Sequence, residues 1–492
     1  MRLRGSSLLL RGVSLIFILL AVVTTVIELI QYSISRANYP SDMTIGNVAV
    51  GGLTPQSAAQ RLLQVYSLPV QLHYGDALIN LDPGLIGFQL NTESMLAAAD
   101  LQRTGAPFWP GFWDYLWNRH SPSRQIPLVS SYSEARLREY LNNEISIRYD
   151  QLPTAAQPVP GTANFNPGTP GQTLDIDQAV ALIESAMQSP DQRAVILSSK
   201  RTLAGRPSLD TLQTLLKQLI NQNNFPGLLD LYFLNLQTQE NIHFAYQAGQ
   251  DISVNTDDIA FSANSSMKVP IMASVYKYFN SQIDNNTDTL ITNMISLSDK
   301  VSSDSLMSSI DPGRGPLVVT ETMQKLGLEN TFIAMYYAEG SIPLQHYSTP
   351  ANSRLDISTD PDTFNQTTPS DMANLLEDIY QCAQMGGGSL VAAFPGQITQ
   401  TACQQMIQYL EEDKLGSLIQ GSLPEGTIVA HKHGWDNNEN NFSDVAIIYT
   451  PGGNYILTIY SYNPEQFMWD VTNRTFGALS RAIYNYINLP SQ

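Results

Sequence analysis

The sequence has little positive charge and few cysteines, and both shortages narrow what the chain can do. Only 26 of its 492 residues are lysine or arginine, against 44 aspartates and glutamates, which gives a formal net charge of -18. A chain this acidic and without a basic run is a poor ligand for phosphate backbones, so we expect no nucleic-acid partner. Cys382 and Cys403 are too few for a disulfide scaffold. They form either one bridge in an oxidising compartment or two buried thiols on neighbouring helices.

Long apolar runs are absent except at the N-terminus. Residues 12–27 read GVSLIFILLAVVTTVI, and the wider stretch 8–30 is about long enough to span a bilayer. Arginines at positions 2, 4 and 11 precede it, which predicts a cytoplasmic N-terminus. A cleaved signal peptide is the alternative, but no convincing small-residue cleavage site follows. We expect a single-pass protein of the cell membrane with extracytoplasmic C-terminal domains.

The chain is too long for one compact domain, and the change of residue pattern along it predicts three parts. Residues 1–36 form the cytoplasmic tip and the transmembrane anchor. Residues 37–200 form an α+β region with two similar cassettes of turns, strands and a helix. Residues 201–492 have a length that suits a single domain.

Each cassette of the middle region contains a predicted helix. Thr54 caps the first helix, which has Pro55 at its first position, and the segment VQLHYGDALINLDPGLIGFQLN then alternates as hairpin strands do. In the second cassette, ANFNPGTPGQTLD leads into a helix. Its predicted apolar face consists of Ala179, Leu182, Ile183 and Ala186.

Between the cassettes, a helix is expected over residues 133–143. The aromatic stretch FWPGFWDYLW, residues 108–117, is more typical of buried core than of a surface that stacks on sugars. With its VGGLTP, IGF and NPGTPGQTLD segments, the whole region resembles domains of exported envelope proteins to which peptidoglycan binding is ascribed. This resemblance implies a wall binder or a spacer without chemistry of its own.

The last part predicts an α+β domain. A helix and two strands come first, a largely helical middle extends from about residue 266 to 419, and three strands and a helix close the chain. One antiparallel sheet built from both ends, with an all-helical lobe inserted, fits this order. The expected strands cover 228–237, 241–250, 427–435, 443–450 and 455–463, and the flanking helices cover 208–222 and 472–487.

Three short motifs in this part point to nucleophilic catalysis. Ser265 and Lys268 form an S-x-x-K, and residues three apart at the start of a helix share one face, so the lysine can reach the serine hydroxyl. A serine hydroxyl needs a neighbouring base, and a lysine with a lowered pKa supplies one. Ser298-Asp299-Lys300 and Lys432-His433-Gly434 follow in that order.

These motifs resemble the S-x-x-K, S-D-N and K-T-G signature of class A β-lactamases and penicillin-binding proteins, over residues 207–490. The resemblance implies that Ser265 attacks an amide or β-lactam carbonyl, that Lys268 takes its proton, and that Ser298 passes a proton to the leaving nitrogen. Lys432 would attract the substrate carboxylate. Backbone N–H groups of Ser265 and Trp435 would form the oxyanion hole, and Gly434 would let the substrate lie against the edge strand.

The chain departs from that signature in three places. Lys300 replaces the usual Asn and His433 replaces the usual Thr, and both still line the expected substrate site. The loop glutamate that class A enzymes use for deacylation falls on Tyr337, although Glu339 could replace it in a reshaped loop. No cofactor is expected. His431 and His433 share a strand face, but no third ligand stands at metal-site spacing.

Three functions remain open. The favoured one is a membrane-anchored serine hydrolase acylated by β-lactams or by D-Ala-type peptides of the cell wall. The second keeps the fold but loses turnover through Lys300 and the missing glutamate, which leaves a penicillin-binding or peptidoglycan-sensing module. The third is a non-enzymatic envelope protein that binds the wall.

Overall fold

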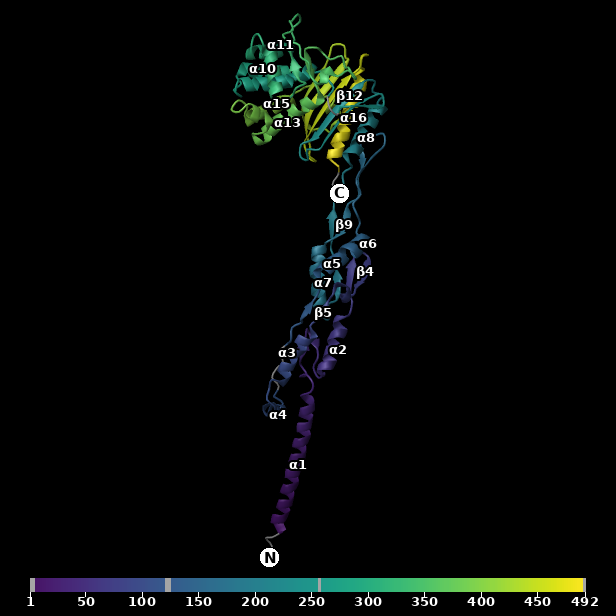
Figure 1. Cartoon of the computed structure of the whole chain (residues 1–492), viewed down its shortest axis with the longest axis vertical. Helices are drawn as coiled ribbons and strands as arrows, with labels where there is room; N and C mark the ends of the chain where they lie inside the picture. The colour runs from purple at the N-terminus through teal and green to yellow at the C-terminus, as the bar shows by residue number, and fades with distance from the viewer. Residues whose placement is uncertain (1–4, 120–124, 255–257, 490–492) are drawn as a thin grey trace. The chain divides into compact units, whose positions relative to one another are not determined.

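The computed structural model describes residues 5–119, 125–254 and 258–489. The chain divides into two compact units (Figure 1). The first comprises Met1–Pro153 and Pro170–Leu203, and the second comprises Thr154–Thr169 and Ala204–Gln492. The segment Thr154–Thr169, which lies within the middle region of the sequence, thus belongs to the second unit.

The first unit begins with the long helix α1 (Gly5–Ser35), which carries the N-terminal apolar run. Its stretch Arg11–Ser35 has 25 residues and is, among the described residues, the one helix long and apolar enough to cross a membrane. At a rise of about 1.5 Å per residue this stretch is about 38 Å long, which exceeds the roughly 30 Å of a hydrocarbon core.

Two small cores follow in the first unit. One lies around α2 (Pro55–Tyr66) and α3 (Thr92–Thr104). As predicted, Pro55 starts α2, and the side chain of Thr54 accepts a hydrogen bond from the backbone N–H of Ser57. The other core lies between a three-stranded sheet and two helices. These elements are β3 (Val70–Tyr74), β4 (Ala77–Leu81), β10 (Ala194–Ile196), α5 (Glu134–Tyr140) and α7 (Ile176–Met187).

Short elements complete the first unit. They are β1 (Thr44–Ile45), β2 (Val48–Ala49), η1 (Pro83–Ile86), β5 (Gln89–Leu90), α4 (Phe108–Leu116), β6 (Ser130–Ser131), η2 (Leu141–Ser146), α6 (Ile147–Tyr149), β9 (Gly171–Leu174) and β11 (Ser199–Thr202). The predicted hairpin is confirmed as β3 and β4, and the helix expected over 133–143 is α5 continued by the π-helical turn η2. The resemblance of residues 37–200 to wall-binding domains stays a prediction.

Two predictions about the cores of this unit are wrong in detail. The buried face of α7 contains Val180 and Met187, whereas Leu182 is 37% exposed, so the apolar stripe is rotated from the predicted one. In the aromatic stretch, Phe112 is buried against Tyr32, but Trp109 and Trp113 are mostly exposed, because they lie on the side of α4 away from that contact.

The second unit is built on a six-stranded antiparallel sheet, which confirms the predicted α+β class. The strand order is β14-β13-β12-β20-β19-β18, so the first and last thirds of the unit meet where β12 pairs with β20. The strands are β12 (Leu228–Asn235), β13 (Asn241–Gln247), β14 (Gln250–Ile252), β18 (Ile428–Trp435), β19 (Asn441–Tyr449) and β20 (Tyr455–Tyr462). β18 is therefore an edge strand.

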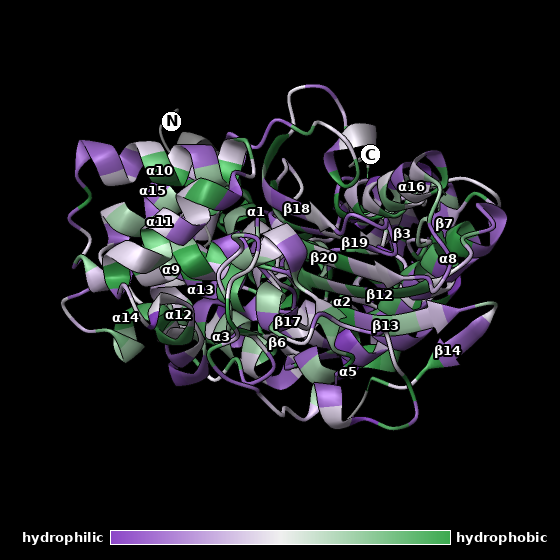
Figure 2. Ribbon diagram, turned by 90° about the horizontal axis from the view of Figure 1, so that it is seen from above, coloured by the Kyte–Doolittle hydropathy of each residue, from purple (hydrophilic) through white to green (hydrophobic). Residues whose placement is uncertain are grey.

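Helices cover both faces of this sheet (Figure 2). On one face, α8 (Leu209–Gln222) and α16 (Trp469–Ile487) enclose an apolar core with the sheet. On the other face lies the predicted helical lobe, around a larger core. The lobe comprises α9 (Lys268–Tyr278), α10 (Asn285–Ser296), α11 (Lys300–Ile310), α12 (Gly315–Lys325), α13 (Pro369–Met385), α14 (Ser389–Ala393) and α15 (Gln400–Glu411).

Further short elements belong to the second unit. A second sheet has the order β15-β17-β16 and consists of β15 (Phe261–Ser262), β16 (Phe332–Ile333) and β17 (Asn365–Thr367). The remaining elements are β7 (Gln157–Pro158), β8 (Phe165–Asn166), η3 (Asn264–Met267), η4 (Ala351–Ser353) and η5 (Gln420–Ser422).

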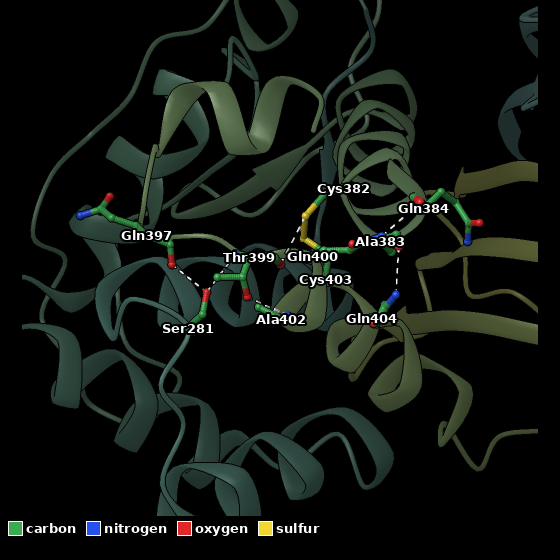
Figure 3. The surroundings of a disulfide bond; sticks show 10 residues. All are labelled: Ser281, Cys382, Ala383, Gln384, Gln397, Thr399, Gln400, Ala402, Cys403 and Gln404. Carbon is green, nitrogen blue, oxygen red and sulfur yellow. Dashed lines mark hydrogen bonds between the residues drawn. A yellow bond between two sulfur atoms is a disulfide. The ribbon is translucent and has the colours of Figure 1, made fainter. Parts of the chain in front are cut away.

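The two cysteines form a disulfide between α13 and α15 (Figure 3). Cys382 and Cys403 have Cα atoms 5.9 Å apart and close a loop with a sequence separation of 21. Ser281 binds the same connection: its hydroxyl donates to the Gln397 carbonyl and accepts from the Thr399 N–H. Of the two states left open by the sequence, the structure therefore has the bridge.

Candidate active site

The predicted nucleophile and its lysine meet at the start of α9. Ser265 lies in the 3₁₀ turn η3, and Lys268 is the first residue of α9, one turn later. The ammonium Nζ of Lys268 donates a hydrogen bond of 2.6 Å to Ser265 Oγ. Asn264, directly before the serine, has a φ of 52°, a left-handed conformation of the kind that often marks a functional turn.

The edge strand β18 lies against this turn. A Cβ atom at Gly434 would come within 2.8 Å of the Ser265 backbone nitrogen and 3.0 Å of Ser443 Oγ. Only glycine therefore permits this approach, because the Ser265 nitrogen cannot give way independently of the chain. The K-T-G-like motif and the S-x-x-K motif are thus neighbours in space.

Lys268 is fully buried, and its surroundings lower its basicity. Burial, together with the positive charges of Lys432 and Lys300, lowers the pKa of Lys268 to about 7. The negative charges of Asp299 and Asp304 act to raise the pKa of Lys268, but they do not outweigh burial and the two lysines. A substantial fraction of this lysine is therefore neutral near pH 7, as a general base requires.

The S-D-N-like turn leads into α11, beside Lys268. Asp299 caps α11 by accepting the Ser302 N–H at 2.8 Å, so part of this motif has an ordinary structural role. Ser298 has a φ of 58°, and its buried hydroxyl has no hydrogen-bond partner among the described residues. Such an unsatisfied group is costly unless it serves a ligand or a proton transfer. Lys300 is exposed.

A buried carboxylate that the motifs do not contain binds the third motif. Asp413, which follows α15, accepts a hydrogen bond of 3.0 Å from Lys432 Nζ, and both side chains are fully buried. His433 Nδ1 lies 2.8 Å from the same Asp413 oxygen, although not aligned for a hydrogen bond. Burial alone would raise the pKa of Asp413, but His433 and the charge of Lys432 hold it well below its usual value.

The two histidines of β18 contact carboxylates. His431 Nδ1 lies 3.0 Å from Asp444 Oδ1 on the paired strand β19. Burial acts to lower the pKa of His431, but the charge of Asp444 and this hydrogen bond raise it. The ring of His433 stacks on Trp435 with centroids 5.0 Å apart. His431 thus contacts Asp444, and His433 contacts Asp413 and Trp435.

The loop after β16 brings Tyr337 to the catalytic lysine. The Tyr337 ring centroid lies 5.0 Å from Lys268 Nζ, and its hydroxyl donates to the Asn264 carbonyl at 3.3 Å. Asp304 of α11 fixes this loop by accepting the backbone N–H groups of Tyr337 and Ala338, each at 2.8 Å. Burial raises the pKa of Tyr337, so its hydroxyl stays protonated.

Glu339 does not join the other predicted residues. Its side chain is exposed, two residues beyond the tyrosine that covers Lys268. The motifs missed Asp413 and Asp304, each of which fixes a residue of the site. Asp304 lies in α11, four residues after Lys300, a spacing that places both on one helix face and that could have identified it.

One cluster in the described residues has the composition of a metal site, and it joins β12 and β13 to the segment before β15. Ligand atoms of Asp230, His243 and Asp258 lie within 4.8 Å of one another. His243 Nε2 is 3.0 Å from Asp230 and 3.5 Å from Asp258. Burial opposes protonation of His243, but the hydrogen bond and charge of Asp230 raise its pKa. His243 thus lies between two carboxylates, whose charge favours its protonated form.

Several solved structures are similar to this chain. PBP-A is 20% identical, with a TM-score of 0.41, and the match covers 57% of this chain and 98% of that one. A beta-lactamase from Sphaerobacter thermophilus is 16% identical over 58% of this chain and 99% of its own, with a TM-score of 0.41. An ancestral class A beta-lactamase is 19% identical over 55% and 98%, with a TM-score of 0.40. A comparison with curated proteins gives no match.

Residues 284–487 match the model of the beta-lactamase enzyme family. The matched range contains Ser298, Lys300, Tyr337 and Lys432 and begins after Lys268, so the assignment of Ser265 and Lys268 depends on their geometry. Through this match, residues 284–487 of the second unit are similar to the beta-lactamase enzyme family.

Proposed function

We propose that the second unit is a serine hydrolase that is acylated at Ser265. The observation that supports this most directly is the 2.6 Å hydrogen bond between Lys268 Nζ and Ser265 Oγ. The lysine in that pair has a pKa of about 7, so the base is available in its neutral form at neutral pH.

In the proposed acylation, neutral Lys268 accepts the hydroxyl proton while Ser265 Oγ attacks the carbonyl carbon of an amide or β-lactam. The carbonyl oxygen becomes an oxyanion held by the backbone N–H groups of Ser265 and Trp435. As the C–N bond breaks, the Ser298 hydroxyl passes a proton to the leaving nitrogen and is reprotonated from Lys268. The products are an acyl ester on Ser265 and a free amine.

Recognition of the substrate is assigned to the edge of β18. Lys432 attracts the carboxylate found on β-lactams and on D-Ala-type peptides, but Asp413 neutralises part of its charge. His433 and the backbone around Gly434 complete this side of the site, and Lys300 adds a second positive charge from α11. The proposed substrates are therefore anionic amides.

A second candidate is a module that acylates but releases its product slowly. It is favoured by Tyr337, which covers Lys268 where a loop carboxylate is expected from the family resemblance, and by the exposure of Glu339. Without a base for the hydrolytic water, the ester persists. Such a protein would be a penicillin-binding or wall-sensing module.

The proposed location is the outer side of the cell membrane, with α1 as the anchor. The length and hydropathy of Arg11–Ser35 support the anchor. The disulfide between Cys382 and Cys403 supports an oxidising compartment for the second unit, because such bridges are rare in the cytosol.

The test uses the full-length protein in detergent, a fluorescent penicillin and nitrocefin, with Ser265→Ala and Lys268→Met variants. Stable labelling of the wild type that is lost in Ser265→Ala would establish acylation, and rapid nitrocefin turnover would establish hydrolysis. Labelling with no turnover identifies the second candidate. If neither reaction occurs, with wall-peptide mimics included, the enzymatic proposal fails and a wall-binding protein is left.

A further inference from the structure

The aromatic helix α4 is fixed to the end of α1 by one of its faces. Tyr32 of α1 contacts the rings of Phe108, Phe112 and Tyr115, with centroids 5.3 to 5.5 Å apart. Gly111 permits this contact, because a Cβ atom there would lie 2.3 Å from the Tyr32 hydroxyl. α4 therefore packs beside the C-terminal end of α1 (Figure 1).

The connection before α4 is held by arginines at the same place. Arg36, directly after α1, donates a hydrogen bond of 2.7 Å to the Ala106 carbonyl, and its guanidinium lies over the Phe108 ring. Arg103 of α3 donates in return to the Arg36 carbonyl at 2.9 Å. The position of α4 relative to the end of α1 is thus fixed by polar and aromatic contacts together.

The other flank of α4 carries large apolar side chains that are mostly exposed. Trp109, Trp113 and Trp117 are 64%, 60% and 67% exposed. Trp109 and Trp113 stand four residues apart and lie on one side of the helix with Leu116, and Trp117 follows as the C-cap residue. Three neighbouring exposed tryptophans form an apolar patch of the kind that marks an interaction surface.

The depth of this patch follows from the geometry of α1. If the hydrocarbon core begins at Arg11 and takes about 20 residues, it ends near residue 30. Tyr32 and Arg36 then lie about 3 Å and 9 Å beyond that boundary, at about 1.5 Å per residue. This is the headgroup region, where tryptophan, tyrosine and arginine are favoured because one end of each side chain is apolar and the other polar.

We infer that α4 is an interfacial membrane helix whose Trp109, Trp113 and Trp117 insert into the leaflet at the C-terminal end of α1. The inference uses the membrane-spanning role of α1 from the proposed function and adds a second attachment beside it. A lipid partner is favoured because α4 packs against the end of α1, whose exposed apolar side chains must also face lipid. Two attachments restrict the tilt and rotation of the first unit at the membrane, which one helix alone would leave free.

The test measures tryptophan fluorescence of the full-length protein in phosphatidylcholine–phosphatidylglycerol vesicles. Brominated acyl chains quench tryptophan on contact. We expect strong quenching that is greater with bromine near the headgroup than with bromine near the methyl end. In a Trp109→Phe, Trp113→Phe, Trp117→Phe variant, the quenchable part of the emission should disappear, whereas the remaining emission of Trp435 and Trp469 should be insensitive to bromine.

Alkaline extraction of the same vesicles separates failure of this inference from failure of the anchor. The wild type and the triple variant should both stay in the membrane, because α1 holds them. If both remain but the wild-type tryptophans are unquenched by brominated lipid, the interfacial helix is excluded while the anchor stands. If the tryptophans are also protected from quenching by acrylamide, a protein or polymer covers them instead of lipid. If alkaline extraction removes the wild type from the vesicles, both the anchor and the interfacial helix are excluded.

Discussion

Lys432 and Asp413 form an ion pair of 3.0 Å with both side chains fully buried, at the edge of the candidate substrate site. Such a pair has little net stabilising value, because its attraction must offset the desolvation of two charges. Removing one partner is costly, however, because the other charge stays buried. The pair therefore makes the charge of Lys432, and through it the pKa of Lys268, depend on Asp413.

Asp413→Asn should destabilise the protein and impair acylation together. We expect a loss of about 3–5 kcal/mol in the free energy of unfolding, because Lys432 loses its buried counter-charge. Lys432 should then lose its proton more readily and bind anionic substrates more weakly, which raises KM. Thermal unfolding and the labelling rate with fluorescent penicillin measure both effects. Glu412→Gln removes an exposed charge from the neighbouring residue and should change neither.

The acylation rate should rise with pH through an inflection at about pH 7. Lys268 is the proposed base and must be neutral, so below that pH the rate should fall about tenfold for each unit. Labelling rates between pH 5 and 9 measure this limb. A pH-independent rate over that range would exclude Lys268 as the base.

The same lysine should leave a signature in stability. Its pKa is about 7 in the folded chain and 10.5 as its ordinary value, so between these values the unfolded chain binds more protons. The contribution of Lys268 to the free energy of unfolding therefore rises as pH increases from 7 to 10.5. Comparing the wild type with Lys268→Met over this range cancels the other titrating groups. A difference that stays constant with pH would contradict the lowered pKa.

Lys300→Asn should move the inflection in the pH dependence of the labelling rate to higher pH. The charge of Lys300 is one cause of the low pKa of Lys268, and its removal lets that pKa rise. At neutral pH the variant should acylate more slowly, although it restores the Asn of the family signature. Lys200→Asn, which removes an exposed charge from the first unit, serves as the control and should leave the inflection in place.

The sequence predicts only some contacts of this site, because some join residues close together in the chain and others join residues far apart. Ser265 and Lys268 lie one helical turn apart, so spacing alone predicts their contact. Asp413 stands 19 residues before Lys432 in an irregular segment, and only the folded chain brings them together. From the sequence, Tyr337 only indicates that the loop glutamate is missing at its position. In the structure its ring also contacts Lys268.

The fold shows the same division. Strands of seven to nine residues, such as β13 and β19, are long enough to be recognised from the sequence. The sheet of β15, β16 and β17 was not predicted, because strands of two or three residues have no measurable period. The sequence predicts the tryptophans of α4 to be buried, but they are exposed, because composition alone cannot tell a covered helix face from an open one.

Replacing both cysteines by alanine should lower stability without abolishing labelling. For a loop with a sequence separation of 21, the chain-entropy argument gives about 3 kcal/mol. Denaturant unfolding of the Cys382→Ala, Cys403→Ala variant measures it. A reducing agent should lower the stability of the wild type to the same value and leave the variant unchanged. If the reductant has no effect on the wild type, the bridge is not formed in the protein tested.

Tyr337→Glu should accelerate release of the acyl group. A carboxylate at the position now covering Lys268 would activate the hydrolytic water, and general base catalysis contributes about 10²–10⁴-fold. The same negative charge should raise the pKa of Lys268, so acylation at neutral pH should become slower while deacylation becomes faster. Tyr337→Phe keeps the ring without the hydroxyl and should release the acyl group as slowly as the wild type. Glu339→Gln should also leave the release rate unchanged, because Glu339 is exposed. If that variant instead loses release of the acyl group, Glu339 is the base. The loop would then have to move away from its hydrogen bonds to Asp304.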